Sequence, residues 1–255
     1  MSKTIASAKV IGQHVLNSST KLIEVYAPEI ANIAEPGQFV NVQVCKNMAP
    51  LLRRAFGVAG VNRETGTFVM MYRILGEGTQ ILAEVCSGDE LSIVGPLGHG
   101  FDMSAKKPLL VGGGLGLAPL LYLAQGFGIG KTDILMGGRS ESELFWTDFY
   151  EGLSEKIFLT TDDGSKGTKG TVMALLPELL TSGTYDCVYV CGPVPMMKAV
   201  ANACLEANVK CQVSLEKYMA CGLGACLSCA CQGIGKRLKV CKDGPVFWAE
   251  EVGEW

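Results

Sequence analysis

Charge is scarce in this sequence, and its charged residues form no runs. Of the 255 residues only 18% are Asp, Glu, Lys or Arg, the formal net charge is −3, and histidine occurs only as His14 and His99. Proteins that bind nucleic acid rely on clustered Lys and Arg to neutralise phosphates. The lack of any basic run therefore argues against nucleic acid as a partner, and the two isolated histidines are interpreted as structural.

Long apolar runs are also missing. A membrane-spanning helix takes about 18 or more consecutive apolar residues, and the longest apolar stretch, residues 109–123, is interrupted by glycines and a proline. The first residues, MSKTIASAKVIGQHVL, lack the charged-then-apolar pattern of a signal peptide. We therefore expect a cytoplasmic, soluble protein with no membrane partner.

The arrangement of apolar residues predicts a mixed β and α/β fold. Up to about residue 100, short runs rich in β-branched and aromatic residues (38–44, 66–74 and 89–98) alternate with turn signals, which is typical of an antiparallel β-barrel. After Lys106, nearly continuous apolar strands alternate with helical patterns, as in a parallel α/β sheet. The predicted domains are a β-barrel over 1–102, a Rossmann-like α/β domain over 103–211 and a small cysteine-rich domain over 212–255.

Cysteine is unusually frequent, and its spacing is informative. Six of the eleven cysteines are scattered singly and are expected to be buried thiols or to line a site: Cys45, Cys86, Cys187, Cys191, Cys204 and Cys211. The other five lie in the last 35 residues, where Cys221-x4-Cys226-x2-Cys229 is followed eleven residues later by Cys241. This spacing is typical of plant-type [2Fe–2S] ligands, and Cys231 is interpreted as a neighbour of the ligands.

Two other interpretations of the cysteine segment stay open. Structural zinc usually takes two short C-x2-C pairs, whereas this segment holds one such pair and a four-residue gap. If the thiols were structural and bound no metal, packing alone would have to explain five cysteines in 21 residues. Gly222 and Gly224 favour the iron–sulfur interpretation, because they permit the tight turns that bring backbone amides close to sulfur.

Two glycine elements follow apolar strands and suggest a nucleotide site. VGGGLGLAP (111–119) lies where the amides at a helix start bind a pyrophosphate, with Gly113, Gly114 and Gly116 in the turn. VCGPVPMMKA (190–199) carries Cys191, Gly192 and Pro193 at the carboxyl end of another strand. The first element is also compatible with a glycine turn needed only for close helix–strand packing, and the second with a strand that simply ends in a turn. The next strand ends on Arg139 and Ser140 without an acidic residue, so the choice between NAD and NADP stays open.

A flavin site is suggested by the segments 50–60 and 71–79. An arginine fork and the amides of Gly78 and Thr79 suit a diphosphate, and Phe56 or Tyr72 can face an aromatic ring system. The alternative interpretation of each residue is a surface arginine or a core aromatic.

Together these motifs resemble the ferredoxin–NADP reductase superfamily, and within it the electron transfer subunits of dihydroorotate dehydrogenase B. The resemblance covers nearly the whole chain and is carried by segments that occur in the same order. They are LLRR (51–54), YRILGEGT (72–79), GPLGHGF (95–101), VGGGLGLAP (111–119), CGPVPM (191–196), EKYMACGLGACLSCAC (216–231) and VCKDGPVF (240–247). The most specific are the last two.

The resemblance implies a set of site residues. The family's flavin motif Arg-Pro-Ile-Ser corresponds to residues 54–57, where only the arginine is kept and glycine replaces the serine. The implied FAD residues are Arg54, Ala55, Phe56, Gly57, Met71, Tyr72, Arg73, Gly78 and Thr79. The implied NAD(H) residues are Gly113, Gly114, Gly116, Cys191, Gly192 and Pro193. The implied cluster ligands are Cys221, Cys226, Cys229 and Cys241.

The implied activity is that of an oxidoreductase subunit in pyrimidine (UMP) biosynthesis. Electrons would pass between NAD(H), FAD and a [2Fe–2S] cluster, to or from the FMN of a separate catalytic subunit that oxidises dihydroorotate, in a heterotetramer with two copies of each chain. No base or nucleophile constellation for orotate chemistry is found, so no catalytic residue is predicted. The alternatives are a reductase subunit of another redox complex (hydrogenase, sulfide or ferredoxin system) and a zinc-containing binding module without redox activity.

Overall fold

The computed structural model describes residues 4–45, 49–253 and 255, which fold into two compact units. Unit 1 holds the residues up to Gly100 together with Glu216–Ala230 and Leu238–Pro245. Unit 2 holds Phe101–Leu215, Cys231–Arg237 and Val246–Trp255. The last 40 residues are thus divided between both units. The division into three domains stays a prediction.

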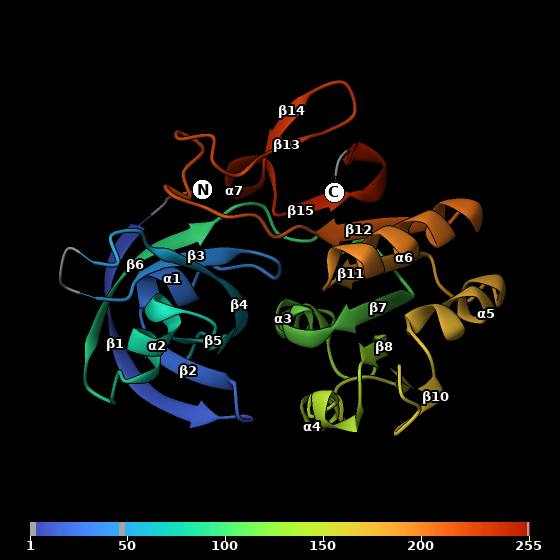
Figure 1. The fold of residues 1–255 in the computed structure, drawn as a ribbon, viewed down its shortest axis with the longest axis horizontal. Helices are drawn as coiled ribbons and strands as arrows, with labels where there is room; N and C mark the ends of the chain where they lie inside the picture. The colour runs from blue at the N-terminus through green and yellow to red at the C-terminus, as the bar shows by residue number, and fades with distance from the viewer. Residues whose placement is uncertain (1–3, 46–48, 254) are drawn as a thin grey trace. The chain divides into compact units, whose positions relative to one another are not determined.

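Unit 1 is built on a closed six-stranded barrel in which neighbouring strands are antiparallel (Figure 1). Its strands are β1 (Thr4–Val15), β2 (Thr20–Tyr26), β3 (Phe39–Gln43), β4 (Arg54–Asn62), β5 (Thr67–Arg73) and β6 (Glu90–Leu97), joined in the order β1-β2-β5-β4-β3-β6. Two short helices, α1 (Pro28–Ala31) and α2 (Glu77–Ala83), connect them. Fully buried Ile23, Val40, Phe68 and Ile93 lie in the core. The predicted antiparallel barrel is confirmed.

Unit 2 is an α/β unit around one mostly parallel sheet. The strand order is β10-β9-β8-β7-β11-β12-β15, and only the last pair is antiparallel. The strands are β7 (Pro108–Gly113), β8 (Asp133–Gly138), β9 (Lys156–Thr161), β10 (Thr168–Lys169), β11 (Cys187–Cys191), β12 (Lys210–Ser214) and β15 (Val246–Trp248). The chain moves outward from β7 in one direction and from β11 in the other. Such a switch of direction is where open α/β sheets bind ligands.

Helices connect the parallel strands, as the alternating sequence pattern predicts. The connecting helices are η1 (Gly114–Gly116), α3 (Leu117–Phe127), η2 (Glu141–Glu143), α4 (Thr147–Tyr150), η3 (Val172–Ala174), α5 (Leu176–Thr181) and α6 (Val194–Glu206). The C-terminal segment adds β13 (Ala230–Gln232), β14 (Arg237–Lys239), α7 (Val240–Asp243) and η4 (Ala249–Glu251). None of the helices in the described part of the chain combines the length and apolar character that a membrane span requires.

Candidate iron–sulfur and nucleotide sites

All four predicted ligand cysteines lie in unit 1, on a segment that is tied to the barrel at two points. Asn41 of β3 donates a hydrogen bond from Nδ2 to the backbone oxygen of Cys221, at 3.3 Å. At the other end, the amide of His99 donates to the carbonyl of Gly244, at 2.6 Å. A Cβ on Gly98 would lie 2.5 Å from that same carbonyl oxygen. The glycine in GPLGHGF therefore allows the barrel end and the cysteine segment to approach each other.

Hydrogen bonds between thiols join the four ligand cysteines in two pairs, and Cys221 of one pair also interacts electrostatically with Cys241 of the other. The thiols of Cys221 and Cys226 interact by hydrogen bonding, and so do those of Cys229 and Cys241. Backbone amides point at sulfur: Leu223 N lies 3.3 Å from Cys221 Sγ, and Cys241 N lies 3.4 Å from Cys229 Sγ. Among the described residues no three His, Cys, Asp or Glu side chains converge on one point where a single ion would sit.

This pairing fits a two-iron cluster better than zinc. A structural zinc ion takes about four ligands around one centre, whereas each iron of a [2Fe–2S] cluster takes two thiolates, with further donors to the sulfurs tuning it. Gly222 and Gly224 have positive φ, of 68° and 84°. A Cβ on Gly222 would lie 2.2 Å from Asn41 Nδ2, and one on Gly224 2.8 Å from Lys242 Cδ. The sharp turns between the cysteines therefore require glycine.

The two pairs differ in electrostatics. Hydrogen bonds from Ser228 and then from Cys221 lower the pKa of the exposed Cys226 thiol to about 6. Burial raises the pKa of Cys221, but the amides of Leu223 and Cys226 outweigh it, so the net pKa is lowered. Burial, followed by the neighbouring Cys229, raises the pKa of Cys241. A bound cation would be needed to hold this buried pair as thiolates.

The remaining cysteines are mostly core residues. Cys187, Cys191, Cys204 and Cys211 are buried in unit 2, as predicted, and Cys231 is buried on β13. Cys45 is half-buried and Cys86 is exposed. The expectation of a buried thiol is wrong for Cys86, because this residue lies in the turn between α2 and β6, where the chain runs at the surface.

The two adjacent arginines of LLRR do different things. Arg53 is held by the barrel: its Nη1 lies 2.5 Å from Ser92 O and its Nη2 lies 2.8 Å from Ser92 Oγ. Arg54 bonds to the carbonyl of Leu52, and its guanidinium lies against Gly78, where a Cβ would be 2.7 Å from Nε. The missing side chain of Gly78 therefore makes room for Arg54. The two segments that were assigned to the flavin thus meet in the structure.

The other predicted flavin residues lie on β4, β5 and α2. Phe56 and Tyr72 are buried with ring centroids 5.7 Å apart, and the Tyr72 hydroxyl donates to Gln13 Oε1 at 3.0 Å. Both rings therefore pack in the barrel, as the core-aromatic alternative expected. Nε of Arg73 is buried without a hydrogen-bond partner among the described residues, so it can take a ligand acceptor. On β4, Ala55 is exposed and Gly57 is half-buried. Met71 is buried on β5, and Thr79 is half-buried on α2.

The two glycine elements of unit 2 meet where the sheet changes direction. β7 and β11 are parallel neighbours, with Gly112 opposite Cys191. A Cβ on Gly116 would lie 2.3 Å from the carbonyl oxygen of Cys191, and one on Gly113 would lie 2.9 Å from Met196 Sδ and 3.4 Å from Pro193 Cδ. Gly114 and Gly192 have positive φ, of 57° and 151°. This cradle of bare backbone is the place where a pyrophosphate fits an open α/β sheet.

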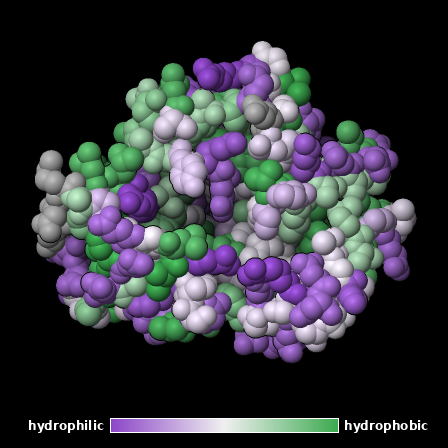
Figure 2. Space-filling view, in the orientation of Figure 1, coloured by the Kyte–Doolittle hydropathy of each residue, from purple (hydrophilic) through white to green (hydrophobic). Residues whose placement is uncertain are grey.

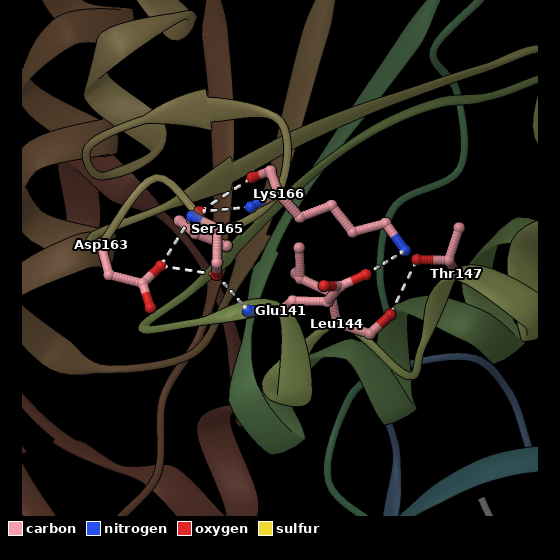
Figure 3. Close-up of polar contacts among 7 residues, drawn as sticks. Glu141, Leu144, Thr147, Asp163, Ser165 and Lys166 are labelled. Atoms are coloured by element: carbon pink, nitrogen blue, oxygen red, sulfur yellow. Dashed lines mark hydrogen bonds and ion pairs between the residues drawn. The ribbon is translucent and has the colours of Figure 1, made fainter.

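Next to this cradle, the loops that follow β8 and β9 are cross-linked by polar contacts (Figure 3). The amide of Glu141 donates to Ser165 Oγ at 2.8 Å, Ser165 donates to Asp163, and Lys166 Nζ lies 3.6 Å from Glu141 Oε1. In the same loop Glu143 holds Arg139: the amide of Arg139 donates to Oε2 at 2.9 Å and its Nε donates to Oε1 at 2.7 Å. The sequence has no acidic residue at the end of β8, but Glu143, four residues after Arg139, supplies a carboxylate there.

Sequence reasoning did not point to Asn41 and Glu143, which contact Cys221 and Arg139 in the structure. The only signal for Asn41 was an asparagine between two valines in the strand pattern FVNVQV (39–44). Nothing in the sequence indicated that Glu143 would fold back onto Arg139.

The fold and the site together define a class of protein. It is a reductase of the ferredoxin-reductase type with an iron–sulfur segment, because it combines a barrel, a parallel α/β unit with a glycine cradle at its switch point, and a segment of paired cysteines. Comparison with solved structures agrees. The structure of an NADH-dependent reduced ferredoxin–NADP oxidoreductase superposes with a TM-score of 0.87, at 29% identity, over 98% of this chain and 90% of that chain. A ferredoxin NADP+ reductase from Neisseria gonorrhoeae with bound FAD and NADP shares the fold, with a TM-score of 0.62, at 18% identity, over 80% of this chain and 91% of that chain.

Sequence comparison is more specific. Residues 216–253 match the profile of the iron–sulfur cluster binding domain of dihydroorotate dehydrogenase B. The electron transfer subunit of dihydroorotate dehydrogenase B (NAD(+)) from Caldanaerobacter subterraneus subsp. tengcongensis is 45% identical over 85% of this chain and 86% of its own length. That from Desulforamulus reducens is 37% identical over 99% of both. The chain belongs to this family: it is an electron transfer subunit of NAD-dependent dihydroorotate dehydrogenase B, an oxidoreductase of pyrimidine biosynthesis.

Proposed function

We propose that this chain passes electrons between NAD(H), FAD and a [2Fe–2S] cluster, and exchanges them with the FMN of a catalytic subunit that oxidises dihydroorotate. The observation that carries the proposal is the arrangement of four cysteines as two pairs, on a segment tied to the barrel that holds Arg54 against Gly78. When bound, FAD accepts a hydride as an electron pair and the cluster carries single electrons, so the flavin stands between nucleotide and cluster.

The chain's own residues have separate tasks in this proposal. Cys221 and Cys226 would bind one iron, and Cys229 and Cys241 the other, with the amides of Leu223 and Cys241 donating to sulfur. Arg54 and the amides near Gly78 and Thr79 would hold the flavin diphosphate, since a guanidinium makes paired hydrogen bonds to phosphate oxygens. Of the remaining residues assigned to the flavin, Ala55, Gly57 and Arg73 would shape the walls around it. Phe56, Met71 and Tyr72 are buried and would support these walls from within the barrel.

The cradle of unit 2 would hold the NAD(H) pyrophosphate. Gly114 is half-buried at the start of η1, Gly113 and Gly116 are buried beside it just before α3, and Gly192 and Pro193 form the facing edge. A side chain on Gly116 would collide with Cys191, so the cradle depends on its absence. The chain therefore orients the nucleotide largely with backbone atoms, which suits an anionic ligand at a helix start.

Glu143 supports NAD over NADP as the nucleotide used. Its carboxylate binds both the amide and the guanidinium of Arg139, and its hydrogen bonds raise the pKa of Arg139. The arginine is therefore already paired, and the acidic residues Glu141 and Asp163 lie in the same two loops. A 2′-phosphate would meet an occupied guanidinium and negative charge.

Glu143→Gln tests this assignment. The substitution frees the Arg139 guanidinium and removes one negative charge, so we expect the ratio of kcat/KM for NADPH to that for NADH to rise about tenfold, the equivalent of about 1.4 kcal/mol. Glu151→Gln removes the same charge from an exposed position in the turn after α4 and is the matched control. An unchanged ratio in Glu143→Gln would contradict the assignment.

The cysteine segment is also the proposed docking surface for the catalytic subunit. Tyr218 is 97% exposed, Leu223 45% and Leu227 52%, and Cys226 is exposed between them. The face drawn in Figure 2 mixes hydrophobic and hydrophilic residues, so exposure alone marks no interface. An electron must leave close to the cluster, and for this reason we assign the docking surface to the cysteine segment.

We propose that the complex is a cytoplasmic heterotetramer with two copies of each subunit.

The proposal is tested by purifying the chain together with the candidate catalytic subunit. We expect FAD, iron and acid-labile sulfide in the purified complex, with two irons per copy of this chain, and NAD+-dependent oxidation of dihydroorotate. Colourless protein with zinc or no metal would refute the cluster. A coloured protein that fails to bind the catalytic subunit would instead favour a reductase subunit of a hydrogenase, sulfide or ferredoxin system.

A further inference from the structure

Asn41 is a buried polar residue on β3, where the other buried residues, Phe39, Val40 and Val42, are apolar. It is 1% exposed, and its strand neighbours Val40 and Val42 are fully buried. Its Oδ1 has no hydrogen-bond partner among the described residues. A buried, unpaired acceptor costs about 1–3 kcal/mol, so barrel packing alone does not favour asparagine at this position.

What Asn41 contacts is the cysteine segment. Its Nδ2 donates to the carbonyl of the predicted ligand Cys221 at 3.3 Å. The same Nδ2 lies close to Gly222, where an added Cβ would be only 2.2 Å from it. The strand register places Asn41 directly opposite Ala55, which belongs to the segment assigned to the flavin. Asn41 therefore joins the strand pair that carries the flavin segment to the first ligand of the cluster.

We propose that Asn41 is a positioning residue that holds the Cys221 end of the cluster segment on the barrel and sets the reduction potential of the cluster. This inference rests on the proposed function, namely that the four cysteines bind a [2Fe–2S] cluster. The carboxamide directs the positive end of its N–H dipole at the cluster segment. Reduction adds one negative charge to the cluster, and donors near it favour that charge. Asn41 therefore raises the potential.

The test compares Asn41→Leu, which keeps the size of the side chain but removes the donor, with Asn41→His, whose Nδ1 can donate from a similar position. Gln43→Leu is the matched control, because Gln43 lies two residues along β3 and contacts Arg53 rather than the cysteine segment. The midpoint potential of each full-length holoprotein is measured by redox titration of the cluster's electron paramagnetic resonance signal. The rate of iron release to a chelator is measured in parallel.

We expect Asn41→Leu to lower the equilibrium constant for cluster reduction about tenfold, which is about 59 mV for a one-electron couple, and to speed iron release. Asn41→His should restore most of both values, and Gln43→Leu should match the unsubstituted protein. A wild-type potential and iron release in Asn41→Leu would overturn the proposal.

Failure to load a cluster also decides the question. If Asn41→Leu takes up no iron, loading by Asn41→His supports the positioning role, and failure of both variants overturns it. The unsubstituted protein separates the two levels of inference. If it holds no iron, the proposed function is wrong. If it holds a cluster whose potential ignores Asn41, only the present inference is wrong.

Discussion

Replacing Cys226 with serine is expected to abolish electron delivery to the catalytic subunit, by more than about 100-fold, while NADH still reduces the flavin. Cys226 is the exposed member of the first thiol pair, and hydrogen bonds from Ser228 and Cys221 hold the pKa of its thiol at about 6. A serine hydroxyl has no comparable tendency to ionise near neutral pH, so it is a poor ligand for iron. Single-turnover reduction of the flavin by NADH and steady-state oxidation of dihydroorotate by the complex measure the two steps separately.

Cys231→Ser is the matched control for this prediction. Cys231 lies five residues further along the same segment but is buried on β13 and is not assigned to the cluster. The Cys231→Ser protein should keep two irons per chain and deliver electrons normally. If flavin reduction by NADH disappears in a folded Cys226→Ser protein, the assigned order of carriers is wrong. If electron delivery persists, Cys226 is not a ligand.

The barrel, the parallel sheet and the cysteine spacing were predictable because each depends on local pattern. Short β-rich runs with turn signals gave β3, β5 and β6 nearly to the residue, and C-x4-C-x2-C marked the segment that the family profile covers. These features repeat along the chain at short range, where period and turn chemistry decide the outcome.

Contacts between distant residues were not predictable from such patterns. Asn41 and Cys221 are 180 positions apart, and their contact depends on how the cysteine segment folds back onto β3. The pairing of β15 with β12, which completes the sheet of unit 2, was not predictable from local pattern either. Such pairings are set by tertiary packing, because a strand as short as β15 does not have enough apolar surface to bury on its own.

The second large effect concerns the two adjacent arginines, of which the family resemblance assigns only Arg54 to the flavin. Arg54→Met is expected to weaken FAD binding by about 100-fold or more. The substitution removes a charged donor fork, and each hydrogen bond to a charged group contributes about 1.5–3 kcal/mol. Arg54 qualifies because its guanidinium lies against Gly78, in the segment assigned to the flavin. The measurement is the dissociation constant of FAD, from the recovery of flavin fluorescence on dilution.

Arg53→Met changes the same side chain one residue earlier and should give the opposite pattern. The Arg53 guanidinium bonds to Ser92 on β6, and burial lowers its pKa, so it is part of the barrel and not of the flavin site. Its loss leaves the acceptors of Ser92 unpaired and should lower the free energy of unfolding by about 2 kcal/mol. FAD affinity in the folded variant should stay within about threefold of the unsubstituted protein, a difference of well under 1.4 kcal/mol. Flavin loss in Arg53→Met, with retention in Arg54→Met, would move the diphosphate site to the other arginine and with it the position of the flavin on β4.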